Sequence, residues 1–154
     1  TTFEGAVFTI TDAPCHPKPV QSPLPIAVGT GSPRMSRITA QHADEWNTWG
    51  TVEEAGRRRA IFAGACERAG RDPATMHMSV QTLVVVGDAT AAAPPGMDDR
   101  WLAGSAEHVV DQMGRYAELG FVEFILPMFH MRGGPTGRRD ALEQFHTEVA
   151  GHFR

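Results

Sequence analysis

A short apolar run followed by a helix-like segment occurs four times after residue 25, and this rhythm restricts the fold more than any other feature of the chain. The apolar runs fall at residues 26–30, 45–49, within 76–86, and at 121–126. Short apolar strands that alternate with longer helices are typical of a parallel sheet covered by helices. We therefore predict an α/β fold in which four parallel strands are adjacent in chain order.

Helix start and stop signals lie between these runs. Ser32, Thr51 and Ser105 each precede a helix-like segment, where a hydroxyl can accept a hydrogen bond from a free N–H of the first turn. Gly70 supplies a left-handed stop for the second helix. A fourth, amphipathic helix is expected over residues 138–153.

The first 25 residues have a different character. Residues 3–10 alternate loosely and predict a strand, and the prolines that follow impose extended geometry on the chain. A length of 154 residues is that of one domain. We predict a single domain, with an extended proline-rich lead-in over residues 1–25 and four βα units over residues 26–154.

Charge and cysteine content exclude several classes of function. The net charge of −4 gives no general attraction to nucleic acid or to an anionic membrane, and no apolar run is long enough to span a bilayer. Cys15 and Cys66 are far apart, which argues against a disulfide scaffold or a zinc ribbon and fits a reducing, cytoplasmic compartment. We expect a small-molecule substrate, no nucleic acid, no membrane and no metal.

The carboxyl ends of the first two predicted strands carry the candidate binding residues. Ligands of parallel α/β folds bind at that edge of the sheet. The first end combines small residues with a helix start at Pro33, so backbone N–H groups and the positive helix end favour an anion there. A tight strand-to-helix turn needs the same glycines, so a purely structural role stays open. The candidates are Gly29, Thr30 and Gly31 at the first end, and Asn47, Thr48, Trp49 and Gly50 at the second.

Other polar and aromatic residues give weaker signals. Trp46 and Trp49 cannot share a face of a regular strand, so one of them is expected to be structural. His130 follows the last strand, where a proton-transfer residue or an ordinary loop residue could stand. Cys15 and His16 are neighbours in an extended segment and point apart. The arginines at 57–59 are interpreted as a solvated helix face, and no catalytic residue is assigned.

Three segments carry a resemblance to a known family: residues 12–21 (DAPCHPKPVQ), 23–29 (PLPIAVG) and 43–50 (ADEWNTWG). Their combination resembles the luciferase-like monooxygenase superfamily and, within it, the F420-dependent oxidoreductases. The resemblance extends through residues 116–120 to the last strand. It implies a TIM (β/α)8 barrel, of which four βα units would form only the C-terminal half.

The resemblance also implies a chemistry. Members of this family transfer a hydride between a deazaflavin or flavin and a small organic substrate, so the expected cofactor is coenzyme F420, with FMN as the alternative. The phosphate end of the cofactor would lie at the two strand ends named above, and the substrate stays open. A non-catalytic half-barrel binding subunit, or a relic without activity alone, is the alternative function.

A half-barrel has consequences for assembly. The inward side of four strands would lack the opposite wall of the barrel, and we expect an apolar surface there because the strands are rich in Val, Leu, Ile and Phe. Such a surface predicts a homodimer, pairing with a missing N-terminal half, or aggregation of the isolated chain.

Overall fold

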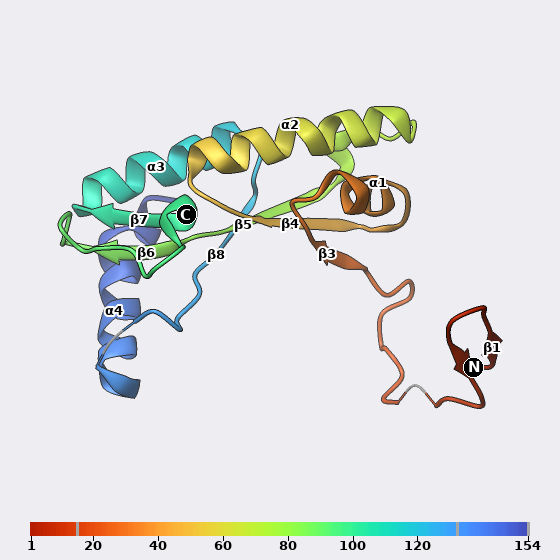
Figure 1. Ribbon diagram of the computed structural model, residues 1–154. Helices are drawn as coiled ribbons and strands as arrows, with labels where there is room; N and C mark the ends of the chain where they lie inside the picture. Colours follow the sequence, from red (N-terminus) through yellow and green to blue (C-terminus); the bar gives the residue numbers. More distant parts are fainter. Residues whose placement is uncertain (15, 132, 154) are drawn as a thin grey trace.

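A computed structural model describes residues 1–14, 16–131 and 133–153 (Figure 1). The strands are β1 (Phe3–Glu4), β2 (Thr9–Ile10), β3 (Ala27–Gly29), β4 (Glu45–Trp49), β5 (His77–Gln81), β6 (Leu83–Val86), β7 (Trp101–Gly104) and β8 (Glu123–Ile125). The α-helices are α1 (Pro33–His42), α2 (Val52–Arg68), α3 (Ala106–Glu118) and α4 (Gly134–Glu148). Short 3-10 turns occur at Pro73–Thr75, Asp98–Arg100 and Ala150–Phe153.

The main sheet has the strand order β3-β4-β5-β8, and every neighbouring pair is parallel. This confirms the predicted α/β fold and the order of its four parallel strands. The predicted caps are also present, since Ser32, Thr51 and Ser105 each accept a hydrogen bond from an N–H of the first turn of the helix that follows. The fold is that of half a parallel barrel, with a second, smaller sheet beside it.

That smaller sheet was not predicted. The run over residues 76–86 divides at Thr82 into β5 and β6, and β6 pairs in parallel with β7. Thr82 is fully buried and its hydroxyl donates a 2.8 Å hydrogen bond to the carbonyl of Arg100, which fixes the break against the start of β7. Helices α3 and α4 both contact β6, so this sheet lies between them (Figure 1).

Two terminal predictions need correction. Residues 3–10 form an antiparallel pair of two-residue strands instead of one strand, because the chain turns at Gly5, whose N–H bonds to the carbonyl of Phe8. The last helix begins at Gly134 instead of residue 138, since Pro135 is tolerated in a first turn, and it ends at Glu148.

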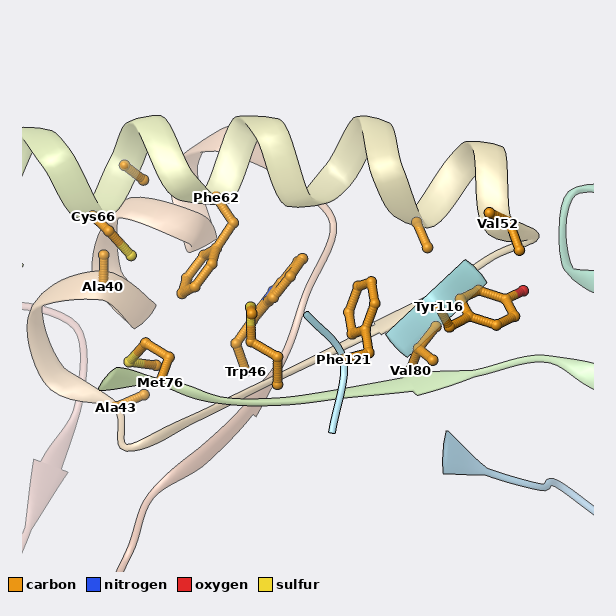
Figure 2. Close-up of a cluster of buried hydrophobic side chains, with 13 residues drawn as sticks. Ala40, Ala43, Trp46, Val52, Phe62, Cys66, Met76, Val80, Tyr116 and Phe121 are labelled. Atoms are coloured by element: carbon orange, nitrogen blue, oxygen red, sulfur yellow. The ribbon is translucent and has the colours of Figure 1, made fainter. Parts of the chain in front are cut away.

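The core lies between the main sheet and the helices (Figure 2). The ring of Trp46 on β4 stacks on Phe62 of α2 with a centroid distance of 4.3 Å and an interplanar angle of 10°, and Phe121 lies 5.9 Å from Trp46. Trp46 is fully buried whereas Trp49 is half-buried. The expectation that one of the two tryptophans is structural is therefore confirmed, although Trp46 packs on the helix side of the sheet and not inside a barrel.

The opposite face of the sheet is polar. Asn47 donates to the hydroxyl of Ser79 at 2.8 Å and accepts from Gln81 at 2.5 Å, and His77 pairs with Glu123 at 2.8 Å. The expectation of an apolar inner surface was wrong for this face, because most apolar residues of these strands point toward the helices and most polar ones toward this face, with Trp49 and Ile125 as apolar exceptions on it. Figure 1 shows α1, α2 and α3 on the other side of the sheet. We call this polar face the open face.

In the part of the chain that the structure describes, no helix combines the length and the apolar character that crossing a membrane requires.

Two glycines with free space around them test the role of backbone geometry. A Cβ would meet no atom within 4 Å at Gly70 or at Gly114, but Gly70 has a φ of +68° and Gly114 lies in α3. We expect Gly70→Ala to lower the free energy of unfolding by about 1 kcal/mol, and Gly114→Ala to raise it by about 0.5–1 kcal/mol. Urea unfolding of both variants measures this difference. Equal effects at the two positions would show that the end of α2 does not need the left-handed conformation.

Candidate functional site

The loop after β3 is held from two sides. The N–H of Thr30 donates to the carbonyl of Asn47 at 2.9 Å, and the indole N–H of Trp46 donates to the carbonyl of Thr30 at 3.0 Å. The N–H of Ser32 donates to the hydroxyl of Thr30 at 3.2 Å. Among the described residues, the N–H of Gly31 has no acceptor, and Gly31 is exposed at the start of α1.

The turn after β4 is fixed more tightly still. Gly50 has a φ of +146°, its N–H donates to the carbonyl of Gln81 at 3.1 Å, and its carbonyl accepts from the buried Tyr116 hydroxyl at 2.7 Å. A Cβ at Gly50 would lie 2.8 Å from the side chain of Glu54. The backbone N–H of Gly50 is therefore engaged within the protein, and this glycine is required by the turn.

The sequence candidates divide between the two faces of the sheet. Gly29 and Asn47 are register partners on the open face, where a Cβ at Gly29 would lie 3.6 Å from the Asn47 amide oxygen. Trp49 follows Asn47 by two positions and lies on the same face. Thr48 points the other way and is buried, with no hydrogen-bond partner for its hydroxyl in the part of the chain described. Its side chain is thus separated from Asn47 and Trp49.

Arg58 joins the two strand ends, and the sequence analysis missed it. A Cβ at Gly31 would lie 3.1 Å from the Arg58 guanidinium carbon, so the side chain from α2 rests against the loop after β3. Its Nε donates to Glu54 at 2.6 Å. Arg58 is 21% exposed, whereas its neighbour Arg57 is 67% exposed. The interpretation of residues 57–59 as a solvated face therefore holds for Arg57 and is wrong for Arg58.

Helical spacing contains the signal that would have located Arg58. Residues four apart lie on the same side of a helix, and Thr51 with Glu54 marks the helix start. Arg58 is therefore on the side of α2 defined by Glu54, one turn further along the helix. Treating the three arginines as one run concealed this difference.

A charged network surrounds the two strand ends. Glu54 pairs with Arg57 and Arg58, and the Asp99 carboxylate accepts two hydrogen bonds from Arg100, at 2.9 and 3.1 Å. Arg58 also lies 3.8 Å from Asp99. Three guanidinium groups thus face two carboxylates, which leaves one positive charge.

Arg100 and Asp99 affect each other's ionisation and shape the rim of the site. The hydrogen bonds from Arg100 lower the pKa of Asp99, with smaller contributions from the positive charges of Arg100 and Arg58. The same hydrogen bonds raise the pKa of Arg100. The Arg100 guanidinium lies 5.5 Å from the centre of the Trp49 ring, a cation–π distance. Trp49 therefore connects the open face with the charged network.

The remaining candidates lie elsewhere. His130 follows β8 and its Nε2 lies 2.9 Å from the carbonyl oxygen of Val84. Cys15, considered with His16, lies outside the described residues. No cluster of three or more metal-ligating side chains occurs within residues 1–14, 16–131 and 133–153.

The strands and helices together form half of a parallel α/β barrel, and the two strand ends described above lie at its carboxyl edge. The chain belongs to the luciferase-like monooxygenase family, which it matches over residues 1–97.

Individual relatives agree with this assignment. The chain is 28% identical, over 125 residues, to the F420-dependent hydroxymycolic acid dehydrogenase of Mycobacterium tuberculosis, covering 80% of this chain and 34% of that protein. The coenzyme F420-dependent tetrahydromethanopterin reductase from Methanopyrus kandleri has a similar structure, with a TM-score of 0.73 and 15% identity over 99% of this chain and 58% of its own.

A long-chain alkane monooxygenase also shares the fold, with a TM-score of 0.60 and 18% identity over 96% of this chain and 47% of its own. The chain thus spans between a third and three fifths of the length of these relatives.

The ionisation of Tyr116 reports on the burial of the turn after β4. Its absorbance change can be assigned without ambiguity, because it is the only tyrosine of the chain. Burial raises the pKa of Tyr116 to about 12. A raised pKa means that the folded state keeps this proton when the unfolded chain has lost it, so the contribution to stability falls as pH rises from about 10 to 12. We expect no tyrosinate absorbance at 295 nm below about pH 11.

The Tyr116→Phe variant is the control, since it removes the absorbance change and the hydrogen bond to Gly50. It should lower the free energy of unfolding by about 1–2 kcal/mol at neutral pH. Titration of the wild-type chain near pH 10 while it is still folded would show that this hydroxyl is exposed.

Proposed function

We propose that this chain is part of an F420-dependent oxidoreductase, with FMN as the alternative cofactor, and that its strand ends hold the phosphate end of that cofactor. The chain would contribute one partial-barrel domain, with residues 1–25 as lead-in and residues 26–154 as four βα units. The proposed binding residues are Gly29, Thr30, Gly31, Asn47, Thr48, Trp49 and Gly50, and Arg58 is added to them. Thr48 and Gly50 would act by shaping the strand end, because the Thr48 side chain is buried and the Gly50 N–H is bonded to Gln81.

The contact between Arg58 and Gly31 is the observation that carries the proposal. A guanidinium rests against a glycine whose N–H is free, at the start of α1, whose positive end faces the same space. A Cβ at Gly31 would lie 3.1 Å from the guanidinium and would displace it. A phosphate group fits this arrangement because it accepts hydrogen bonds from N–H groups and pairs with guanidinium.

The ring of the cofactor would lie toward the open face. A deazaflavin supplies hydride exchange with a substrate carbon when it is bound. Asn47 is held by Ser79 and Gln81, so it presents a fixed amide on this face. Trp49, backed by Arg100, presents an aromatic surface beside it. These residues would bind and orient the ring. Because their side chains are already held in place, binding would lose little side-chain conformational entropy.

The open face also bears on the partner. The three relatives described above are longer than this chain, which covers 34%, 58% and 47% of their lengths, and this supports a second half of the barrel as the natural cover for this face. We propose that a second half-barrel, in the same polypeptide or in a second copy of the chain, covers it. Because the face is polar, the contact would be made through hydrogen bonds such as those of Asn47 and Gln81 instead of a broad apolar surface.

Two substitutions test the cofactor site. Arg58→Ala removes the guanidinium, and Gly31→Ala displaces it and narrows the space beside the free N–H. We expect each to weaken F420 binding by at least about tenfold, or roughly 1.4 kcal/mol, in a fluorescence titration of the purified protein. A parallel titration with FMN distinguishes the two cofactors.

Arg57→Ala and Gly114→Ala are matched controls. Arg57 pairs with the same carboxylate as Arg58 but is exposed, and Gly114 has free space on a distant helix. Both should bind F420 as the wild type does. Equal losses for Arg57→Ala and Arg58→Ala would mean that general charge, and not the strand-end contact, governs binding.

A further inference from the structure

A cavity lies beside the smaller sheet, where β6 and β7 meet α4 and the loop after β8 (Figure 1). Its volume is about 430 Å³, which is within the range of small-molecule sites. The larger apolar side chains of its lining are Val84, Val86, Trp101, Leu126 and Phe145. Such a lining favours the hydrocarbon part of a ligand.

The two rings of this lining that carry an N–H group use it within the protein. The indole N–H of Trp101 donates to the carbonyl of Ala91 at 2.8 Å. The Nε2 atom of His130 lies 2.9 Å from the carbonyl oxygen of Val84, and a carbonyl can only accept, so Nε2 carries a hydrogen. Neither ring therefore has this N–H left to donate to an anionic ligand.

The rim of the cavity carries an accessible acceptor instead. Asp88 is exposed and is the one Asp, Glu, Lys or Arg side chain among the described residues of the lining. The N–H and the hydroxyl of Thr90 donate to it at 2.9 and 2.7 Å, and both bonds go to the same oxygen, Oδ1. These hydrogen bonds lower the pKa of Asp88, so it is a carboxylate at neutral pH, with Oδ2 facing no such donor.

Gln144 of α4 adds a second acceptor at the same end of the cavity. A Cβ at Gly87 would lie 3.3 Å from the Gln144 side-chain nitrogen, so this amide rests against the residue that precedes Asp88. The nitrogen donates to Glu148 at 3.3 Å. The amide oxygen of Gln144 can accept from a ligand, and it would do so beside the carboxylate.

The loop that carries Asp88 is already held in place. The N–H of Gly87 donates to the carbonyl of Gly104 at 2.7 Å, and the bond from Trp101 fixes Ala91 on the other side of Asp88. Little loop freedom is therefore lost when a ligand binds. A fixed carboxylate and an amide oxygen at one end of an apolar cavity select a ligand with a cationic N–H donor on a hydrocarbon body.

We propose that this cavity binds a small primary ammonium ion with an apolar body, whose N–H groups donate to Asp88 and Gln144 and whose hydrocarbon part lies against Val86 and Phe145. The proposal does not rest on the cofactor site at the ends of β3 and β4. Its test is made without cofactor, so a failure here leaves the F420 titration unaffected, and the reverse also holds.

The experiment compares three ligands of nearly equal shape and different charge at neutral pH. Cyclohexylmethylamine is cationic, cyclohexylmethanol is neutral and cyclohexanecarboxylate is anionic. Isothermal titration calorimetry gives the three affinities. We expect the amine to bind at least about fivefold more tightly than the alcohol, and the carboxylate to bind most weakly. In the ¹⁵N-labelled protein, the amine should shift the side-chain resonances of Trp101 and Gln144.

Two variants and a matched control locate the site. Asp88→Asn keeps an acceptor for Thr90 but removes the charge, and it should abolish the preference for the amine over the alcohol. Ala141→Leu fills the cavity from α4 and should weaken the amine and the alcohol alike, by at least about tenfold. Asp140→Asn removes the same charge from the exposed side of α4, outside the lining, and should change neither affinity.

Equal binding of the amine and the alcohol by the wild type would overturn the role of Asp88, and so would equal losses in Asp88→Asn and Asp140→Asn. Undiminished binding by Ala141→Leu would overturn the location. Tightest binding of the carboxylate would overturn the class of ligand, and absence of amine binding up to its solubility limit would overturn the proposal as a whole.

Discussion

The indole of Trp46 joins the hydrophobic core to the strand-end loop, and both depend on it. One face of the ring stacks on Phe62 in the core, and its N–H holds the carbonyl of Thr30. Because Trp46 is fully buried, its ring has little freedom to move, and its hydrogen bond to the carbonyl of Thr30 keeps a fixed position. The loop that presents the free N–H of Gly31 is therefore placed by the packing of α2 on the sheet. Loss of the ring would disturb stability and the site together.

The strict alternation of strand residues explains why one short strand serves two purposes. Along β4, Trp46 and Thr48 point to the helices, whereas Asn47 and Trp49 point to the open face. The covered side supplies burial, and the open side supplies an ordered amide and an aromatic surface. A polar open face suits the wall of a ligand-binding barrel, whose interior must accommodate a cofactor as well as side chains. A barrel interior packed only with apolar side chains would instead require an apolar face here.

The sequence was sufficient where the signals are local. Capping hydroxyls at Ser32, Thr51 and Ser105 act within one turn of a helix, and all three helices begin where expected. It was insufficient where a contact joins distant segments. Arg58 reaches Gly31 across the start of two helices, and β7 exists because β6 provides it with a partner. The apolar content of the strands was correctly recognised, but the face that carries it depends on which side the helices cover.

The central claim is that the ends of β3 and β4 bind the phosphate end of the cofactor. Backbone amide shifts of the ¹⁵N-labelled protein, recorded as F420 is added, test it most directly, because they report on each N–H separately. The account predicts that the largest changes fall on Gly31 and the first turn of α1, with a matching change at the Nε of Arg58. Changes confined to other parts of the molecule, with Gly31 and Arg58 unaffected at saturation, would contradict it.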